Sequence, residues 1–411
     1  MFAPPTRAEG LARLARFVPR AGQAYAESRN EDRGPRDRAN VSTLSPWIRH
    51  RLVTEREVLA AVLAGHRLED AEKFVQEVLW RTYWKGWLEQ RPGVWDRYLA
   101  RRGADLRALE TDLSLRRRVE EATAGRTGIA GFDDWAHELA ETGYLHNHAR
   151  MWFSSIWIFT LRLPWALGAD FFLRHLIDGD PASNTLSWRW TAGLQTPGKT
   201  YLARADNIAR FTGGRYVPDG LSHSAEPLVE APPPTPRGVP PADTPRPLDA
   251  ALLVTEEDMT PEHWDIGPIR PKAVLVAHAT AARSPLATSP MVLGFADGAA
   301  ADAAMRASEH FGVPAHLVAL APQALTDAAR ALRVGALATG FAPVGPAADA
   351  LVRAQASLAD AGVALLRLRR SLDARAWPHA TRGFFAFRKA IPDLLAEEGL
   401  IPPPSPARAA R

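Results

Sequence analysis

The chain has 411 residues, of which 46% are hydrophobic and 23% are charged, which is ordinary for a globular protein of roughly two or three domains. It contains no cysteine, which excludes disulfides, thiolate zinc sites and iron–sulfur clusters. The net charge is +4; residues 1–220 carry 32 Lys and Arg against 27 Asp and Glu, whereas residues 221–411 carry 18 against 19. The mildly basic first part suits a polyanionic partner, although a plain solvated surface would look much the same.

Membrane and export segments are not expected. Charged residues interrupt the first 18 residues, so they hold no apolar run of signal-peptide length. The most apolar run, residues 151–167, contains Arg162 and Pro164 and is too short to span a bilayer comfortably. We therefore expect a cytoplasmic protein without a membrane partner.

The first part of the chain, residues 1–217, is predicted to be all-α. After a short amphipathic helix, residues 25–40 are polar and read as a loop, and residues 92–126 are charged and helical with loops. No strand pattern interrupts these helices. The clearest apolar periodicities predict helices over residues 7–18, 69–89, 133–142, 147–163, 170–177 and 182–194.

One helix start and one helix face stand out in this part. Small hydroxyl residues at 42–45 precede a helix, where they favour an N-cap or, with its free amides, a phosphate site. In the helix over 69–89, Glu77, Trp80, Arg81 and Trp84 share one stripe opposite the apolar face. A surface salt bridge with aromatic cover is the plain interpretation of that stripe.

The second part of the chain has a different organisation. Ten of the 34 prolines lie between residues 218 and 247, so residues 218–249 are predicted to be an extended, poorly packed linker. Short apolar runs then alternate with helical stretches, which predicts an α/β domain with a parallel sheet over residues 250–392. One of those expected strands is 291–293. Residues 393–411 are expected to be a disordered tail.

Charged and amide side chains gather on an apolar background between residues 143 and 190. Arg150, Asp178, Asp180 and Asn184 fall there, and an unpaired buried charge is costly. Arg150 is the obvious partner for either aspartate. A buried ion pair in a helical core is the plain interpretation of each residue alone.

The combination HNxxRM, IDGDxxxN and WxW, over residues 146–190, resembles the flavin pocket of the photolyase/cryptochrome family. The resemblance covers about residues 25–190 and implies FAD bound in a U-shape within the helical domain. It implies that the diphosphate lies at a tyrosine and an S-x-L-S-P turn. The cofactor-binding residues it implies are Tyr25, Ser42, Leu44, Ser45, Arg81, Asn147, Arg150, Asp178, Asp180 and Asn184.

The resemblance also implies an activity and a partner. Reduced FAD, excited by light, would pass an electron to a pyrimidine dimer flipped out of UV-damaged DNA. Trp188 and Trp165 match the inner members of an electron-transfer chain, and Trp152, Trp157 or Trp135 could be the outer one. The residues expected to act on the lesion are Glu77, Trp80, Asn147, Met151, Asn184 and Trp190.

Two functions from different classes follow. The first is a light-driven DNA photolyase, favoured because Glu77, Trp80 and Trp190 occur together. The second is a cryptochrome-like photoreceptor with a signalling partner, favoured by a departure from the family pattern after Trp190. A flavoprotein without light chemistry is a third. The α/β domain resembles the family's antenna domain, placed here after the helical one, and its second chromophore is unknown. The lesion, dimer or (6-4) product, also stays open.

Overall fold

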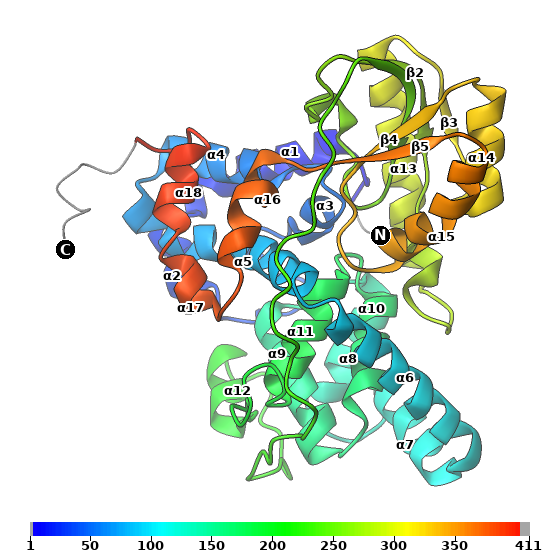
Figure 1. The fold of residues 1–411 in the computed structure, drawn as a ribbon. Helices are drawn as coiled ribbons and strands as arrows, with labels where there is room; N and C mark the ends of the chain where they lie inside the picture. The colour runs from blue at the N-terminus through cyan, green and yellow to red at the C-terminus, as the bar shows by residue number, and fades with distance from the viewer. Residues whose placement is uncertain (1–2, 403–411) are drawn as a thin grey trace.

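The computed structural model describes residues 3–402, and these begin with a helical part that confirms the expected all-α architecture (Figure 1). Helix α5 is the longest of this part and runs through its middle. The helices are α1 Arg7–Phe17, α2 Gln23–Ser28, α3 Ser45–Arg49, α4 Glu55–Gly65, α5 Leu68–Glu89, α6 Gly93–Thr111, α7 Leu113–Thr123, α8 Phe132–Thr142, α9 Asn147–Ser155, α10 Trp165–His175, α11 Pro181–Thr191 and α12 Ala205–Phe211.

Capping chemistry explains several helix starts near the later site. Thr54 and Glu57 form a reciprocal capping box at α4, and Asp180 accepts from the Ser183 amide at the start of α11. The expected helix over 147–163 is shorter as an α-helix, because a π-helical turn at Ile156–Thr160 follows α9. None of the helices in the described part of the chain is long and apolar enough to cross a membrane.

The linker is extended but not loose. It runs across the helical part from α12 to the sheet as an extended segment without regular secondary structure (Figure 1). Arg97 donates to the carbonyls of Ala231 and Pro232, and the Arg237 amide donates to the Gln90 carbonyl. The expectation of poor packing is therefore wrong at these points, because helix side chains and carbonyls satisfy its backbone.

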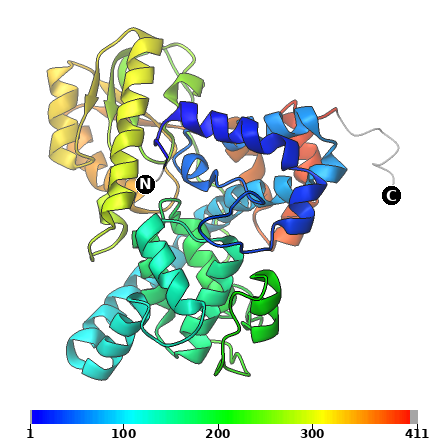
Figure 2. The same cartoon turned by 180° about the vertical axis from the view of Figure 1, so that it is seen from behind.

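A five-stranded parallel sheet follows, as expected, in the order β3-β2-β1-β4-β5. Helix α13 lies on one face and α14 and α15 on the other, as the two opposite views show (Figures 1 and 2). The elements are β1 Leu248–Val254, β2 Ile269–Val276, α13 Pro290–Phe311, β3 Ala315–Leu317, α14 Pro322–Ala331, β4 Ala336–Gly340, α15 Pro346–Asp360 and β5 Ala364–Leu368.

Two expectations about this half are wrong. Residues 291–293 lie in α13 rather than a strand, because Ser289 caps that helix and Pro290 begins it. The tail does not begin at 393, because the chain returns to the helical part as α16 Ser371–Ala376, α17 Phe384–Arg388 and α18 Ile391–Glu397. The end of the expected tail, residues 403–411, lies outside the described residues.

Helices α16 and α17 pack against α5, and α18 packs against α16, away from the sheet that precedes them (Figure 1). A Cβ on Gly86 would lie 2.7 Å from the Trp377 ring, so only glycine allows this close approach. The Tyr83 hydroxyl donates to the Arg382 carbonyl at 2.7 Å. Residues 371–401 are thus built into the helical part, which the expected boundary at 392 did not anticipate.

Candidate functional site

A cavity of about 520 Å³ opens in the helical part, within the usual size range of small-molecule sites. Its walls come from the α2–α3 region, α5, residues 144–151 and α11, with residues 176–180 between them. Of the residues expected to bind the cofactor, to act on the lesion or to form the inner electron-transfer pair, Trp165 alone is not part of its lining, and the three outer tryptophan candidates also lie outside it. Those that line it are Tyr25, Ser42, Leu44, Ser45, Glu77, Trp80, Arg81, Asn147, Arg150, Met151, Asp178, Asp180, Asn184, Trp188 and Trp190.

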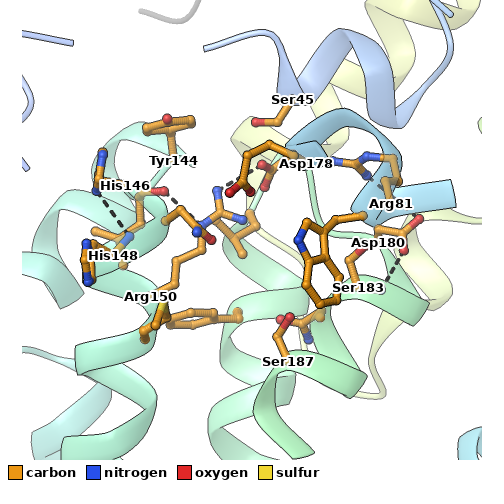
Figure 3. A pocket seen from close by; sticks show the side chains of 18 of the residues that line it. Ser45, Arg81, Tyr144, His146, His148, Arg150, Asp178, Asp180, Ser183 and Ser187 are labelled. Carbon is orange, nitrogen blue, oxygen red and sulfur yellow. Dashed lines mark hydrogen bonds and ion pairs between the residues drawn. The ribbon is translucent and has the colours of Figure 1, made fainter. Parts of the chain in front are cut away.

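Arg150 and Asp178 form an ion pair in the middle of the cavity (Figure 3). The Arg150 Nη2 lies 2.9 Å from Asp178 Oδ2, and its Nε donates to the Leu145 carbonyl. Burial alone would raise the pKa of Asp178, but the Arg150 guanidinium outweighs it and holds that pKa below its usual value. Asp178 is therefore a fixed carboxylate, and its Oδ1 has no hydrogen-bond partner among the described residues.

Asp180 lies deeper, in a network of buried charges. Its Oδ2 is 3.4 Å from Lys85 Nζ, 3.8 Å from Arg49 Nε and 3.9 Å from Arg81 Nη1. Lys85 and Arg49 also contact Glu257, which follows β1, at 3.3 and 2.6 Å. Burial raises the pKa of Asp180, but these cations hold it far below its ordinary value. The network joins the cavity floor to the carboxyl edge of the sheet.

The α3 side of the cavity is a tight turn. Thr43 has a φ of 51°, the Leu44 amide donates to the Ser42 hydroxyl, and residues 42–45 line the cavity. Ser45 begins α3 and faces Asp178 across the cavity (Figure 3). Tyr25 closes this side, and burial raises its pKa well above its ordinary value, so its hydroxyl stays protonated.

Glu77 and Trp80, on α5, form what we call the mouth of the cavity, and both already have partners. Glu77 Oε1 lies 2.7 Å from Arg29 Nη1 in a pair whose side chains are 34% and 25% exposed. The Trp80 ring stacks on Phe384 with centroids 3.6 Å apart and planes 11° apart. Burial raises the pKa of Glu77, against the opposing charge of Arg29. One face of Trp80 is covered, so the expected stacking role is restricted to its other face and edge.

Four further residues that the sequence singled out lie on the α9 and α11 side. Asn184 donates one amide N–H to the Ala169 carbonyl at 2.8 Å, which leaves its oxygen and its second N–H for the cavity. Trp190 is stacked on Tyr201 with centroids 5.5 Å apart. Asn147 begins α9, and Met151 lies one turn further along it.

The two tryptophans expected to form the inner part of an electron-transfer chain, Trp188 and Trp165, line different cavities. Trp188 lines the cavity, and its ring contacts Trp157 with centroids 6.2 Å apart. Trp165 instead lies near Tyr98 and beside a second cavity of about 570 Å³. Of the three outer candidates, Trp157 is the one that touches Trp188, whereas Trp135 and Trp152 stack on each other.

The cavity fits a flavin nucleotide with a diphosphate. Several buried polar atoms of the lining have no hydrogen-bond partner in the described chain. They include Asp178 Oδ1, Ser183 Oγ, Arg81 Nη1 and Trp188 Nε1. Donors and acceptors of this kind match ring nitrogens, ribityl hydroxyls and phosphate oxygens. No group of three or more potential metal ligands occurs among residues 3–402.

Sequence reasoning did not anticipate several residues. His146 donates from Nε2 to the Arg29 carbonyl and accepts the His148 amide at Nδ1, which orders the loop that carries Arg29. Burial lowers the pKa of His146 to about 4, so it is neutral. The roles of Lys85 and Glu257 were not predicted, because their charged partners lie on other elements. The stacking of Phe384 on Trp80 was not predicted either, because the two residues are some 300 positions apart. The sequence shows only that Lys85 and Glu257 are charged and that Phe384 is aromatic.

The comparisons with known proteins concern the same helical region. Residues 74–216 match the FAD binding domain of DNA photolyase. A deoxyribodipyrimidine photo-lyase of Thermus thermophilus is 33% identical over 217 residues, which is 53% of this chain and 49% of that protein. One from Streptomyces griseus is 31% identical over 189 residues, 41% of this chain and 38% of that protein.

A solved structure was also found. The class III photolyase from Agrobacterium tumefaciens is 25% identical and superimposes with a TM-score of 0.42, covering 52% of this chain and 44% of that one. The chain thus spans about half the length, or less, of the relatives it matches. The family match ends before β1.

Proposed function

We propose that this chain, a member of the photolyase/cryptochrome family through its helical part, is a light-driven DNA-repair enzyme that acts on pyrimidine dimers. FAD is the cofactor of the matching domain. The observation that carries the proposal is that one cavity brings together the cofactor set around Arg150 and Asp178 and the lesion set around Glu77, Trp80 and Trp190. UV-damaged DNA would be the partner.

When bound and reduced, FAD supplies on illumination an electron that splits the dimer and afterwards returns. The residues of the chain prepare this chemistry. Ser42, Ser45 and Tyr25 would hold the diphosphate, and Arg81 would neutralise part of its charge. Arg150 and Asp178 would orient the ring system through the free Asp178 Oδ1.

Asn184 would lie beside a nitrogen of the flavin ring. The Ala169 carbonyl accepts one of the two amide N–H groups of Asn184, so the amide oxygen and the second N–H remain. The side chain would therefore be able to hydrogen-bond that nitrogen in its protonated or its unprotonated state.

The lesion would enter between α5 and α11. Trp190 and the uncovered side of Trp80 would pack against the flipped bases, with Met151 and Asn147 beside them. Glu77 would hydrogen-bond the dimer, and it must first release Arg29. Such a bond stabilises charge that develops only after electron transfer.

Trp188 would carry electrons to the cofactor from the protein surface. Its ring contact with Trp157 gives one route, and Trp165, at the second cavity, gives another. Indole suits this role because its large π-system is readily oxidised.

The test is photoreactivation with purified, fully reduced protein under blue light. Defined duplexes carrying one cyclobutane dimer or one (6-4) product are compared with the undamaged duplex, and a sample kept in the dark is the control. Repair of the cyclobutane duplex in the light alone is expected. Neither preferential binding nor repair of either lesion would overturn the enzyme proposal.

The second candidate is a cryptochrome-like photoreceptor that signals to a partner. The observation that favours it is the state of the mouth, where Glu77 and Trp80 are engaged by Arg29 and Phe384. A photoreceptor would show light-driven changes in flavin absorbance without repair.

We also propose an antenna-like accessory role for the α/β domain, with an unidentified second chromophore. Sheets of this order bind nucleotides at the carboxyl edge, where the strand order reverses. Here that edge, between β1 and β4, is followed by Glu257 and Asp258, which pair with Arg49, Lys85 and Arg370. A chromophore would therefore have to lie elsewhere on the domain. Its excitation spectrum, compared with that of protein carrying FAD alone, tests this role.

A further inference from the structure

The short helix α17 packs one aromatic side chain against the cavity lining and exposes the next one to solvent. Phe384 is buried against Trp80, a lining residue, while the next residue, Phe385, is 79% exposed. A buried ring and an exposed ring thus lie side by side in sequence at the rim. Single exposed apolar residues are common on protein surfaces, so the surroundings of Phe385 decide what it means.

Those surroundings are basic. Arg382, Arg388 and Lys389 are exposed, and residues 374–392 contain neither Asp nor Glu. None of the three forms an ion pair with any residue in the described range 3–402. Arg375, just before them, differs, because it contacts Glu397 and Glu398 at 3.4 and 3.2 Å. Residues 381–389, called the α17 strip below, therefore carry three positive charges without ion-pair partners in the described range, on both sides of Phe385 in the sequence.

The α17 strip is also held rigidly on α5, the helix that carries Glu77 and Trp80. The Tyr83 hydroxyl donates to the Arg382 carbonyl at 2.7 Å, and Arg91 Nη2 donates to the Thr381 carbonyl at 2.6 Å. Phe387 is buried against the Tyr83 ring. Figure 1 shows α17 at the end of the helical part, beside α2 and α5. Its position relative to the mouth is thus fixed before any ligand binds.

We propose that residues 381–389 are a DNA-contact surface in which Phe385 packs against a base next to the flipped lesion and Arg382, Arg388 and Lys389 contact phosphates. The proposal rests on the repair function and names a binding segment for it that comes from the far end of the chain. Base flipping removes stacking partners, and an apolar ring can replace one of them. The basic residues supply the sequence-independent attraction to the backbone.

The experiment measures binding of the full-length, FAD-loaded protein to labelled duplexes over a range of salt concentrations. One duplex carries a single thymine dimer and the other is its undamaged match. Phe385→Ala should weaken binding to the damaged duplex by roughly 5- to 150-fold, as for loss of one base-stacking ring. The double variant Arg388→Gln/Lys389→Gln should lower the salt slope on both duplexes by about 2.

Matched controls come from the α/β domain. Leu317 is 62% exposed on β3, and Arg330 and Arg353 are exposed on α14 and α15. Leu317→Ala and Arg330→Gln/Arg353→Gln should leave affinity and salt slope unchanged. The substituted side chains at 385, 388 and 389 are exposed, so flavin absorbance and melting temperature should match those of the parent protein.

The outcomes separate the two proposals. Wild-type affinity and slope in the α17 variants would overturn the DNA-contact surface, as would equal losses in the control variants. A third outcome is that the double variant lowers the salt slope as expected, while the parent protein binds damaged and undamaged duplexes equally. That result would support the DNA-contact surface and contradict the repair function.

Discussion

The two sides of the cavity hold ion pairs of different kinds. On the floor, Asp180, Lys85, Arg49 and Glu257 are each at most 3% exposed, and every one has at least two charged neighbours. At the mouth, Glu77 and Arg29 are 34% and 25% exposed and form a single pair. A buried network is costly to break and fixes geometry, whereas a half-exposed pair can exchange partners cheaply. The geometry of the floor is therefore fixed, whereas the pair at the mouth can rearrange.

The largest expected effect comes from breaking the floor. Glu257→Ala leaves Arg49 and Lys85 buried without that counterion, which costs about 3–5 kcal/mol of unfolding free energy. Denaturant unfolding of the purified protein measures it. Glu397→Ala, which removes an exposed partner of Arg375, is the control and should cost at most about 1 kcal/mol. Equal losses would mean that the network does not hold the two halves together.

Acid should loosen the mouth before the floor. Burial lowers the pKa of His146 to about 4 from 6.5, so between these values the unfolded chain binds a proton that the folded chain does not. Stability therefore falls as pH falls through this window, by up to about 3 kcal/mol at about 1.4 kcal/mol per pH unit. The melting temperature between pH 7.5 and 4 measures this loss.

His146→Gln should reduce that pH dependence, whereas His316→Gln, on the exposed strand β3, should not. Protonation at Nδ1 would also remove the acceptor of the His148 amide and release the Arg29 loop. An unchanged pH profile in His146→Gln would show that another group controls acid stability.

Removing the charge of the cofactor pair should weaken FAD binding. Asp178→Asn keeps the shape but takes the counterion from Arg150, and loss of a charged hydrogen bond costs about 1.5–3 kcal/mol. The dissociation constant of FAD, from titration of apoprotein, should rise by roughly ten- to 150-fold. Asp206→Asn, in an exposed pair with Arg204, should bind FAD normally. Normal FAD binding in Asp178→Asn would place the cofactor away from this pair.

At the mouth, loss of the Trp80 ring and loss of the Glu77 carboxylate should affect different measured quantities. Trp80→Ala should weaken binding to damaged DNA by roughly 5- to 150-fold, toward the lower end because Phe384 covers one face of the ring. Glu77→Ala should instead lower repair per absorbed photon with a smaller change in affinity. Binding isotherms and repair quantum yields, measured on the same samples, distinguish the two. A large affinity loss in Glu77→Ala would mean that it holds the lesion before electron transfer.

The smallest effect on binding is expected for Trp188→Phe, which should keep FAD but slow light-driven flavin reduction, because a phenyl ring is much harder to oxidise. Trp157→Phe and Trp165→Phe then show which of these two tryptophans passes electrons to Trp188. The ring contact with Trp188 favours slower reduction in Trp157→Phe. Transient absorption of the flavin measures the three rates. Unchanged kinetics in Trp188→Phe would mean that the electrons take another route.

The sequence by itself determined the all-α first part, the parallel sheet and the lining of the cavity. Helical periodicity and the close spacing of Arg150, Asp178, Asp180 and Asn184 are local signals, and a shared apolar background forces such groups to pair. Short apolar runs that alternate with helices likewise predict a parallel sheet from neighbouring residues alone.

Tertiary structure decided what depends on partners distant in the chain. Phe384 covers Trp80 from some 300 positions away, Glu257 pairs with Arg49 and Lys85 from another fold element, and the Ala169 carbonyl engages one N–H of Asn184. The ring contact between Trp188 and Trp157 has the same origin. Residue type and spacing specify which groups need partners. Only the packing of whole elements chooses among the partners available, because burial and distance set the energy of each pair.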